Sequence, residues 1–281
     1  MFPGQLEDDA RDILAKAAFG LGLAPAIVAE RSGVPQRTVM AAMGKNAFPA
    51  LADITDDQWR AMATALQLAP EALLAIARGR YRPQVALPDG LVCIATRQRQ
   101  LEVNAWILAN PSTGDAIIVD TGADARPLLG HVTARQWKVR LLLLTHDHPD
   151  HIAALPELRS ALPELQVYSP PLDFVPGTVA LPDSGKISSA LGEISCLPTP
   201  GHTDGGTTYH ARLGPITIAF VGDALFAGSI GGPRHSYSEA LRSLREDVFT
   251  LPPETILCPG HGPATTIALE AASNPFLVTG L

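Results

Sequence analysis

The chain has 281 residues, of which 46% are hydrophobic and 17% charged, so it can bury a sizeable core in one large or two unequal domains. Its formal net charge of −7 disfavours a general nucleic-acid or anionic-membrane surface. The three cysteines lie far apart and form no CxxC pair, which excludes a disulfide framework and a cysteine zinc knuckle. An acidic N-terminus and the lack of an apolar run of about 20 residues predict a cytoplasmic protein without a membrane span.

Residues 1–80 are expected to form a small all-α domain. Apolar residues recur at helical spacing near Ile13 and again from Trp59 to Leu66, and strand-like runs are absent. Asp56-Asp57 and Pro70-Glu71 are typical of helix starts. The following stretch, 81–90, is rich in Pro and Gly and predicts a linker.

Residues 25–43 of this domain resemble a helix-turn-helix of the phage-repressor type. Ala29, Gly33 and Val39 occupy the small, turn and core positions that two tightly crossing helices need. However, residues 1–80 carry eight Lys/Arg and nine Asp/Glu, whereas a DNA reader needs an excess of cations to neutralise phosphates. This balance disfavours nucleic-acid binding and favours a packing or homo-oligomerisation module.

Residues 91–281 are expected to form a second, α/β domain. Short β-rich runs alternate with stretches of helical pattern at 124–137 and 237–250. The expected strands are 91–94, 104–108, 116–119, 139–144, 216–221 and 256–258.

Polar residues follow the apolar runs of this domain, where each run ends. A strand that ends in a polar residue places it on the rim of the sheet, and five such segments predict one shared site. The residues are Asp120, His146, His202, Asp223 and His261.

Residues 146–151, His-Asp-His-Pro-Asp-His, have the spacing of metal ligands. In an extended segment, residues two apart face the same side, so His146 and His148 can bind one ion. Asp150 and His151 follow the turn at Pro149 and can bind a second ion.

Three later residues can complete both sets. His202 would give the first ion three imidazoles, His261 would give the second two imidazoles and a carboxylate, and Asp223 is the candidate bridge. Imidazole and carboxylate without thiolate suit Zn(II), Fe(II) or Mn(II).

These motifs, in this order, are similar to those of the metallo-β-lactamase superfamily of binuclear hydrolases. The phrases after Gly222 and Cys258 look most like its glyoxalase II-type branch, and the resemblance covers about residues 90–278. It implies a four-layer αβ/βα sandwich with two Zn(II) ions, or Fe or Mn, at one edge. It also implies that Asp120 steadies the histidine loop, although capping of a local turn is an equal alternative.

The resemblance implies a zinc-dependent, hydroxyacylglutathione hydrolase-like enzyme. Such an enzyme would cleave a small-molecule thioester, ester or lactone with a metal-bridging hydroxide, and Asp150 would be both ligand and orienting acceptor. A mononuclear iron persulfide dioxygenase-like enzyme is one alternative. A nucleic-acid-associated hydrolase or regulator that uses the helical domain is another.

Four residues are candidates for substrate contact. Tyr209 resembles a tyrosine near the site of related hydrolases, with strand packing as the alternative. Arg234, His235 and Tyr237 lie in the segment after the Asp223 motif, with a solvated loop as the alternative.

Two departures from the family pattern bear on the substrate. Only 20 residues follow His261, so the basic C-terminal region of the larger glyoxalase II enzymes is missing and glutathione recognition is in doubt. True β-lactamases of the superfamily usually lack a bridging aspartate, so Asp223 disfavours a β-lactam as natural substrate.

Overall fold

The computed structural model describes residues 5–44 and 50–278, and its first part is helical. Helix α1 starts at Asp9, whose side chain caps the first turn in a box with Asp12, and Thr55 and Gln58 form the same box before α4. Helices α2 and α5 begin with proline, which suits the first turn. The helices are α1 (Ala10–Gly20), α2 (Pro25–Ser32), α3 (Gln36–Ala42), α4 (Asp56–Ala65) and α5 (Pro70–Ala77), with a short 3-10 turn at Leu51–Asp53.

Two six-stranded mixed sheets follow. The first has the order β1-β2-β3-β4-β5-β6 and the second β14-β13-β10-β9-β8-β7, with a small β11-β12 pair beside them. The first sheet contains β1 (Leu91–Gln98), β2 (Leu101–Ala109), β3 (Asp115–Val119), β4 (Lys138–Leu143), β5 (Gln166–Ser169) and β6 (Val179–Ala180). The remaining strands are β7 (Lys186–Ser189), β8 (Gly192–Pro198), β9 (Thr207–Leu213), β10 (Ile216–Gly222), β11 (Leu225–Phe226), β12 (Ser229–Ile230), β13 (Ile256–Pro259) and β14 (Thr265–Thr266).

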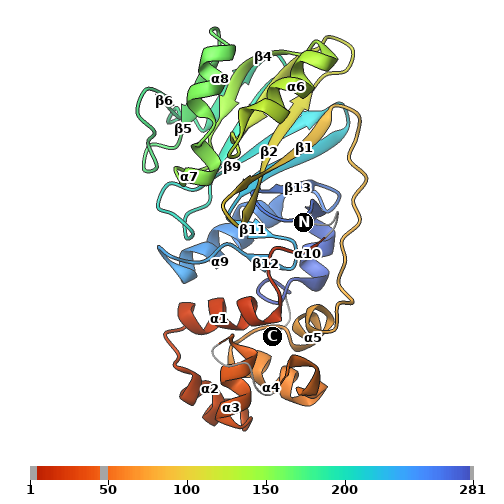
Figure 1. Ribbon diagram of the computed structural model, residues 1–281, viewed down its shortest axis with the longest axis vertical. Coiled ribbons are helices and arrows are strands. Elements are labelled where there is room, and N and C mark those ends of the chain that lie inside the picture. The colour runs from red at the N-terminus through yellow and green to blue at the C-terminus, as the bar shows by residue number, and fades with distance from the viewer. Residues whose placement is uncertain (1–4, 45–49, 279–281) are drawn as a thin grey trace.

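The sheets pack face to face, and helices cover both outer faces (Figure 1). Alternation along β10 places Ile218 and Phe220 between the sheets and Ala219 and Val221 on the opposite face. The first sheet is covered by α6 (Ala125–Arg135) and α8 (Leu155–Ala161), and the second by α9 (Tyr237–Glu246) and α10 (Ile267–Ser273). These layers confirm the expected αβ/βα sandwich preceded by a helical region.

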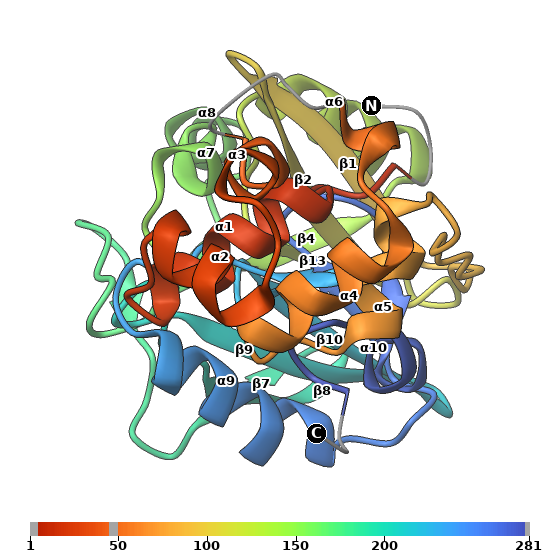
Figure 2. The ribbon, with the colours of Figure 1, turned by 90° about the horizontal axis from the view of Figure 1, so that it is seen from below.

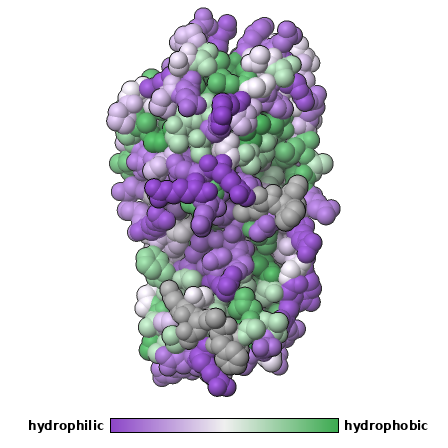
Figure 3. Space-filling view, in the orientation of Figure 1, coloured by the Kyte–Doolittle hydropathy of each residue, from purple (hydrophilic) through white to green (hydrophobic). Residues whose placement is uncertain are grey.

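Helices α1–α5 lie across one end of this sandwich (Figures 1 and 2). They share a hydrophobic core with it, in which Ile13 and Leu73 pack in the same cluster as Val221 and Leu257. The helical region is therefore joined to the sandwich by a continuous apolar interior. On the outside, hydrophilic side chains gather across the middle of the face seen in Figure 3.

The segment between α5 and β1 contains no regular element, as expected of residues 81–90. It is nevertheless anchored, because the buried Tyr81 hydroxyl donates to Glu270 Oε1 at 2.5 Å. Glu270 is fully buried and also accepts from Thr265, Asn274 and the Gly228 backbone.

Within the described ranges, no single helix is long and apolar enough to cross a membrane. Only α1 and α2 taken together have the required length and composition, and they are bent by 102° relative to each other.

Candidate metal centre

The ends of several strands deliver the predicted residues to one edge of the sandwich. His146 and His148 lie in the loop after β4, and Asp150 and His151 lie on the short helix α7 (Pro149–Ile152) that follows it. His202 lies in the loop after β8, Asp223 directly follows β10, and His261 comes two residues after β13.

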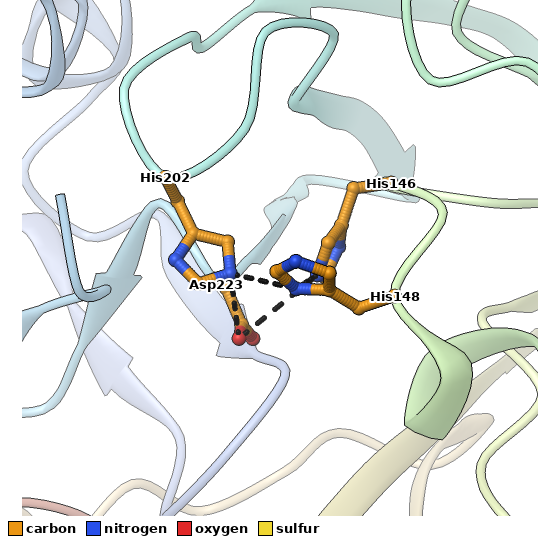
Figure 4. A group of neighbouring side chains, drawn as sticks. All are labelled: His146, His148, His202 and Asp223. Carbon is orange, nitrogen blue, oxygen red and sulfur yellow. Dashed lines mark hydrogen bonds and ion pairs between the residues drawn. The ribbon is translucent and has the colours of Figure 1, made fainter. Parts of the chain in front are cut away.

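A first group of ligand-type side chains contains three histidines and one aspartate (Figure 4). His148 Nδ1 lies 3.0 Å from His146 Nε2 and 2.9 Å from His202 Nε2. The Asp223 Oδ2 atom lies 3.4 Å from His202 Nε2 and 4.0 Å from His146 Nε2. All four side chains therefore converge on one small volume.

A second group consists of Asp150, His151 and His261. Asp150 Oδ2 lies 3.3 Å from His261 Nε2 and 3.9 Å from His151 Nε2. The structure thus brings together all seven residues that the sequence singled out as metal ligands.

Asp223 faces both groups. Its Oδ1 atom lies 3.3 Å from His151 Nε2 and its Oδ2 atom 3.5 Å from His261 Nε2, in addition to the contacts with the first group. A carboxylate in this position can place one oxygen on each of two cations.

The outer ring nitrogens of four histidines are occupied, which turns their Nε2 atoms toward the centre. His202 Nδ1 donates to the Gly232 carbonyl at 2.8 Å and His261 Nδ1 to the Glu102 carbonyl at 2.6 Å. His151 Nδ1 lies 2.8 Å from Asp120, and His146 Nδ1 lies 3.0 Å from Thr145 Oγ1. Such outer contacts fix the orientation and tautomer of metal-binding imidazoles.

Asp120 links the two halves of the histidine motif. Its Oδ1 accepts from the Thr145 backbone and its Oδ2 from the Thr145 hydroxyl, both at 2.8 Å, while Oδ2 also contacts His151. Asp120 has φ of 57°, a left-handed conformation that non-glycine residues rarely adopt. These contacts place it where it can hold the loop that carries His146 and the helix that carries His151.

Gly260 lets the backbone pass close to the centre. A Cβ atom at this position would lie 2.3 Å from Asp223 Oδ1 and 2.5 Å from His151 Cε1, which is closer than real Cβ contacts allow. Its backbone nitrogen donates to the Gly222 carbonyl at 2.8 Å. Glycine is therefore required where β13 passes the carboxylate.

The charges of the cluster divide its histidines into two kinds. Burial holds the pKa of His146 and of His202 below the usual range, so both are neutral at pH 7. Burial also lowers the pKa of His151 and of His261, but the surrounding carboxylates together outweigh it and raise the values to about 10 and about 11, with Asp223 joined by Asp120 at His151 and by Asp150 at His261. Burial raises the pKa of Asp223, yet the positive charges of His151 and His261 lower it well below the usual range. Without cations, the centre is thus a carboxylate cluster held together by two imidazolium ions.

One predicted substrate contact is wrong. Tyr209 is fully buried between the sheets, and its hydroxyl donates to the Leu144 carbonyl at 2.6 Å, so it packs the core. The Tyr237 ring is half-buried and packs against Gly20 of α1, where a Cβ atom would lie 2.3 Å from the ring, and burial raises its pKa to about 12. The contact of Tyr237 with a substrate stays a prediction.

Arg234 and His235 lie at the surface beside the first group. The backbone N–H of His235 donates to the Gly201 carbonyl, so this segment rests on the loop that carries His202. His235 Nε2 lies 2.8 Å from Asp204 and 3.4 Å from Glu239, and Arg234 is exposed. Their contact with a substrate stays a prediction.

Three further residues shape the centre and carry no sequence signal for it. Glu102 acts through its backbone carbonyl, which leaves no side-chain signal, and Thr145 acts through its contacts with Asp120 and His146. Glu7 precedes α1 and lies against Gly262, and no motif connects it to the site.

A family model described as "Metallo-beta-lactamase superfamily" matches residues 99–261, the span that carries all seven ligand candidates. The chain belongs to this superfamily.

Solved structures show the same relationship. This chain is similar to BLEG-1 B3 metallo-beta-lactamase, with 30% identity and a TM-score of 0.57, and the match covers 67% of this chain and 100% of that one. It is similar to ETHE1 from Myxococcus xanthus at 25% identity and a TM-score of 0.58, covering 68% of this chain and 86% of that one. TTHA1623, solved in a di-iron-bound form, matches at 30% identity and a TM-score of 0.55, covering 66% of this chain and 100% of that one.

Proposed function

We propose that this superfamily member is a binuclear metal-dependent hydrolase that cleaves a thioester, ester or lactone, in the manner of a hydroxyacylglutathione hydrolase. The observation that carries the proposal is the position of Asp223 between the two groups of ligand-type atoms, since its Oδ1 faces His151 and its Oδ2 faces both His202 and His261. Two Zn(II) ions are the expected cofactors, and iron or manganese are alternatives. The similarity to TTHA1623, which was solved in a di-iron-bound form, supports a centre for two cations.

The donor set fits such cations. His151 Nε2 and Asp223 Oδ1 are buried and form no hydrogen bond of good geometry among the described residues, although they face each other across 3.3 Å. Buried polar atoms are rarely left unpaired, because desolvation without a partner is costly. These atoms are therefore available to a bound ion.

The residues divide into two ligand sets. His146, His148 and His202 would hold one cation. Asp150, His151 and His261 would hold the other, and Asp223 would contact both. When bound, two such cations supply Lewis acidity and an activated water for hydrolysis.

Asp150 has a second role in this proposal. Burial raises its pKa, but the hydrogen bond and charge of His261 lower it by more, so its carboxylate is anionic at neutral pH. Because this carboxylate lies at the edge of the centre, it can accept a hydrogen bond from the attacking water and orient it. Asp120 positions His151 and contacts no reacting atom.

Metal analysis combined with a substrate panel tests the proposal. We expect about two metal ions per purified chain and hydrolysis of thioesters, esters or lactones above the rate of a metal-stripped sample. The panel should contain a β-lactam, because of the likeness to BLEG-1, and a phosphodiester. One iron per chain with oxygen consumption would contradict it in favour of the persulfide dioxygenase-like alternative, and a salt-dependent shift of DNA would favour the nucleic-acid alternative.

A further inference from the structure

A cavity of about 580 Å³ lies on the His261 side of the metal centre. One wall is the inward face of the β1–β2 hairpin, including Cys93, Ala95 and Trp106. The opposite walls come from the segment 83–87 before β1 and from Pro263 and Ala264 after His261. The volume falls in the range of roughly 300–1,000 Å³ that is usual for small-molecule sites, and most of its lining is apolar.

This cavity shares a wall with the metal centre. Glu102 lines it, and the Glu102 carbonyl accepts from His261 Nδ1 at 2.6 Å. Asn104 also lines it, and its side-chain amide donates to the Gly262 carbonyl at 2.9 Å. The residues that hold the His261 loop are therefore the same ones that form the cavity.

The start of the chain runs from the cavity to the centre. Gln5 lines the cavity, and two residues later Glu7 packs against Gly262, where a Cβ atom would lie 3.1 Å from the Glu7 nitrogen. Gly262 has φ of 73°, which favours glycine and permits this approach. Glu7 Oε2 is buried without a hydrogen-bond partner among the described residues, and the charges of His261 and Asp223 act on this carboxyl.

Helix α1 holds this N-terminal segment in place. Lys16 forms an ion pair with Asp8, and its Nζ donates to the Ile230 carbonyl at 2.8 Å. Lys16 Nζ also lies 4.9 Å from the centre of the Phe226 ring, which in turn contacts the His261 ring at 5.6 Å. The helical region thus fixes residues 5–8 beside the centre.

We propose that this cavity binds the apolar part of the substrate, and that residues 5–7 line the path from the cavity to the reacting carbonyl. The proposal rests on the proposed hydrolase function and names its substrate class: an acyl compound with an extended apolar group. The helical region then determines specificity, because it supplies Gln5 and Glu7 and fixes their position.

Filling the cavity tests this proposal. Ala95→Phe adds a ring at an exposed strand position that tolerates aromatic residues, and Gln5→Trp fills the cavity from the opposite side. Ala271→Phe, at an exposed position on α10, is the matched control. The metal-loaded full chain is assayed with two thioester series, one from acetyl to decanoyl on a common thiol and one of acetyl esters of alkyl thiols of increasing length.

We expect the wild type and Ala271→Phe to prefer long chains in one series. We expect both cavity variants to lower kcat/KM for long chains by about tenfold or more, with short chains and metal content unchanged. Length profiles that match the wild type in both cavity variants would overturn the proposal and leave the hydrolase function standing.

Binding of sodium octanoate to the metal-loaded protein, followed by calorimetry, provides a readout that does not need hydrolysis. We expect octanoate to bind the wild type and Ala271→Phe at least about tenfold more tightly than either cavity variant. If the wild type hydrolyses no substrate, the proposed function fails and this measurement decides alone. Equal octanoate binding by all four proteins, or binding by none, would then reject the cavity as an apolar site.

Discussion

The Oδ2 atom of Asp120 lies 2.8 Å from Nδ1 of His151. The backbone of Asp120 itself adopts the left-handed conformation. A backbone conformation that is costly for aspartate is maintained where the side chain holds an imidazole and the loop beside it. Asp120, which directly follows β3, therefore helps to set the position of His151 in the metal centre.

We expect Asp120→Asn to weaken metal binding. An amide cannot stabilise His151 by charge, and loss of such outer contacts lowers metal affinity by about 10–100-fold. Competition with a chromophoric chelator measures the change, and the exposed Asp89→Asn is the control. Unchanged affinity in Asp120→Asn would restrict Asp120 to capping its own turn.

Loss of a ligand should remove metal and activity together. We expect His148→Ala and Asp223→Ala each to lower the hydrolysis rate by about 10³ or more, with a matching loss of bound metal. Metal analysis and initial rates on the same samples test this. Full metal content with retained activity in either variant would refute the assignment.

Metal affinity should rise with pH. Burial lowers the pKa values of His151 and His261, but the surrounding carboxylates, Asp223 foremost, together raise them to about 10 and about 11, so both imidazoles are protonated at pH 7 in the metal-free protein. A metal must displace these protons, so apparent affinity should increase by up to about a hundredfold per pH unit while both are displaced. Zinc titrations at several pH values, with proton release measured in weak buffer, check the sign. Affinity that falls or stays constant as pH rises from about 6 to 8 would contradict it.

A methyl group at Gly260 should disrupt the centre. The Cβ atom of Gly260→Ala would collide with Asp223 and His151, so we expect loss of metal binding. Gly130→Ala is the matched control, because its Cβ meets nothing within 4 Å, and alanine should stabilise α6 by up to about 1 kcal/mol. Equal metal content in the two variants would be incompatible with the observed approach of β13 to Asp223.

The Tyr81–Glu270 hydrogen bond should contribute to stability. We expect Tyr81→Phe to lower the free energy of unfolding by about 1–2 kcal/mol, because it removes a donor from a buried carboxyl. Urea unfolding measures this. The control Tyr168→Phe, whose hydroxyl only accepts from the exposed Gln166, should change stability by less than about 0.5 kcal/mol.

Four ligand candidates, His146, His202, Asp223 and His261, were predictable because each follows an apolar run, and the end of a buried strand leaves few places for a polar residue. The pairing of His146 with His148 also followed from spacing alone. The starts of α4 and α5 were predictable from Asp56 and Pro70, because acidic residues and proline favour the first turn of a helix through local interactions. Strands β5 and β7, of four residues each, and the longer β8 and β9 were not predicted, because polar residues interrupt their apolar ones.

Other features depend on contacts between distant parts of the chain. Tyrosine is a residue type that often contacts a substrate, and only the tertiary structure shows that Tyr209 packs between the sheets and that the Tyr237 ring packs against Gly20 of α1. Glu7 reaches the centre because α1 docks on the β11–β12 pair, and no local pattern encodes that docking. The role of Glu102 lies in its carbonyl, so its identity as glutamate gave no signal.

Because α1–α5 and the second sheet share a continuous apolar interior, the stability of each part depends on the other. Heating should melt them in one calorimetric transition, and a protease should find no cleavage product in which the sandwich survives alone. During evolution, a mutation on one side of this interior restricts the mutations that the other side can accept. The helical region and the sandwich would then diversify as one inherited unit.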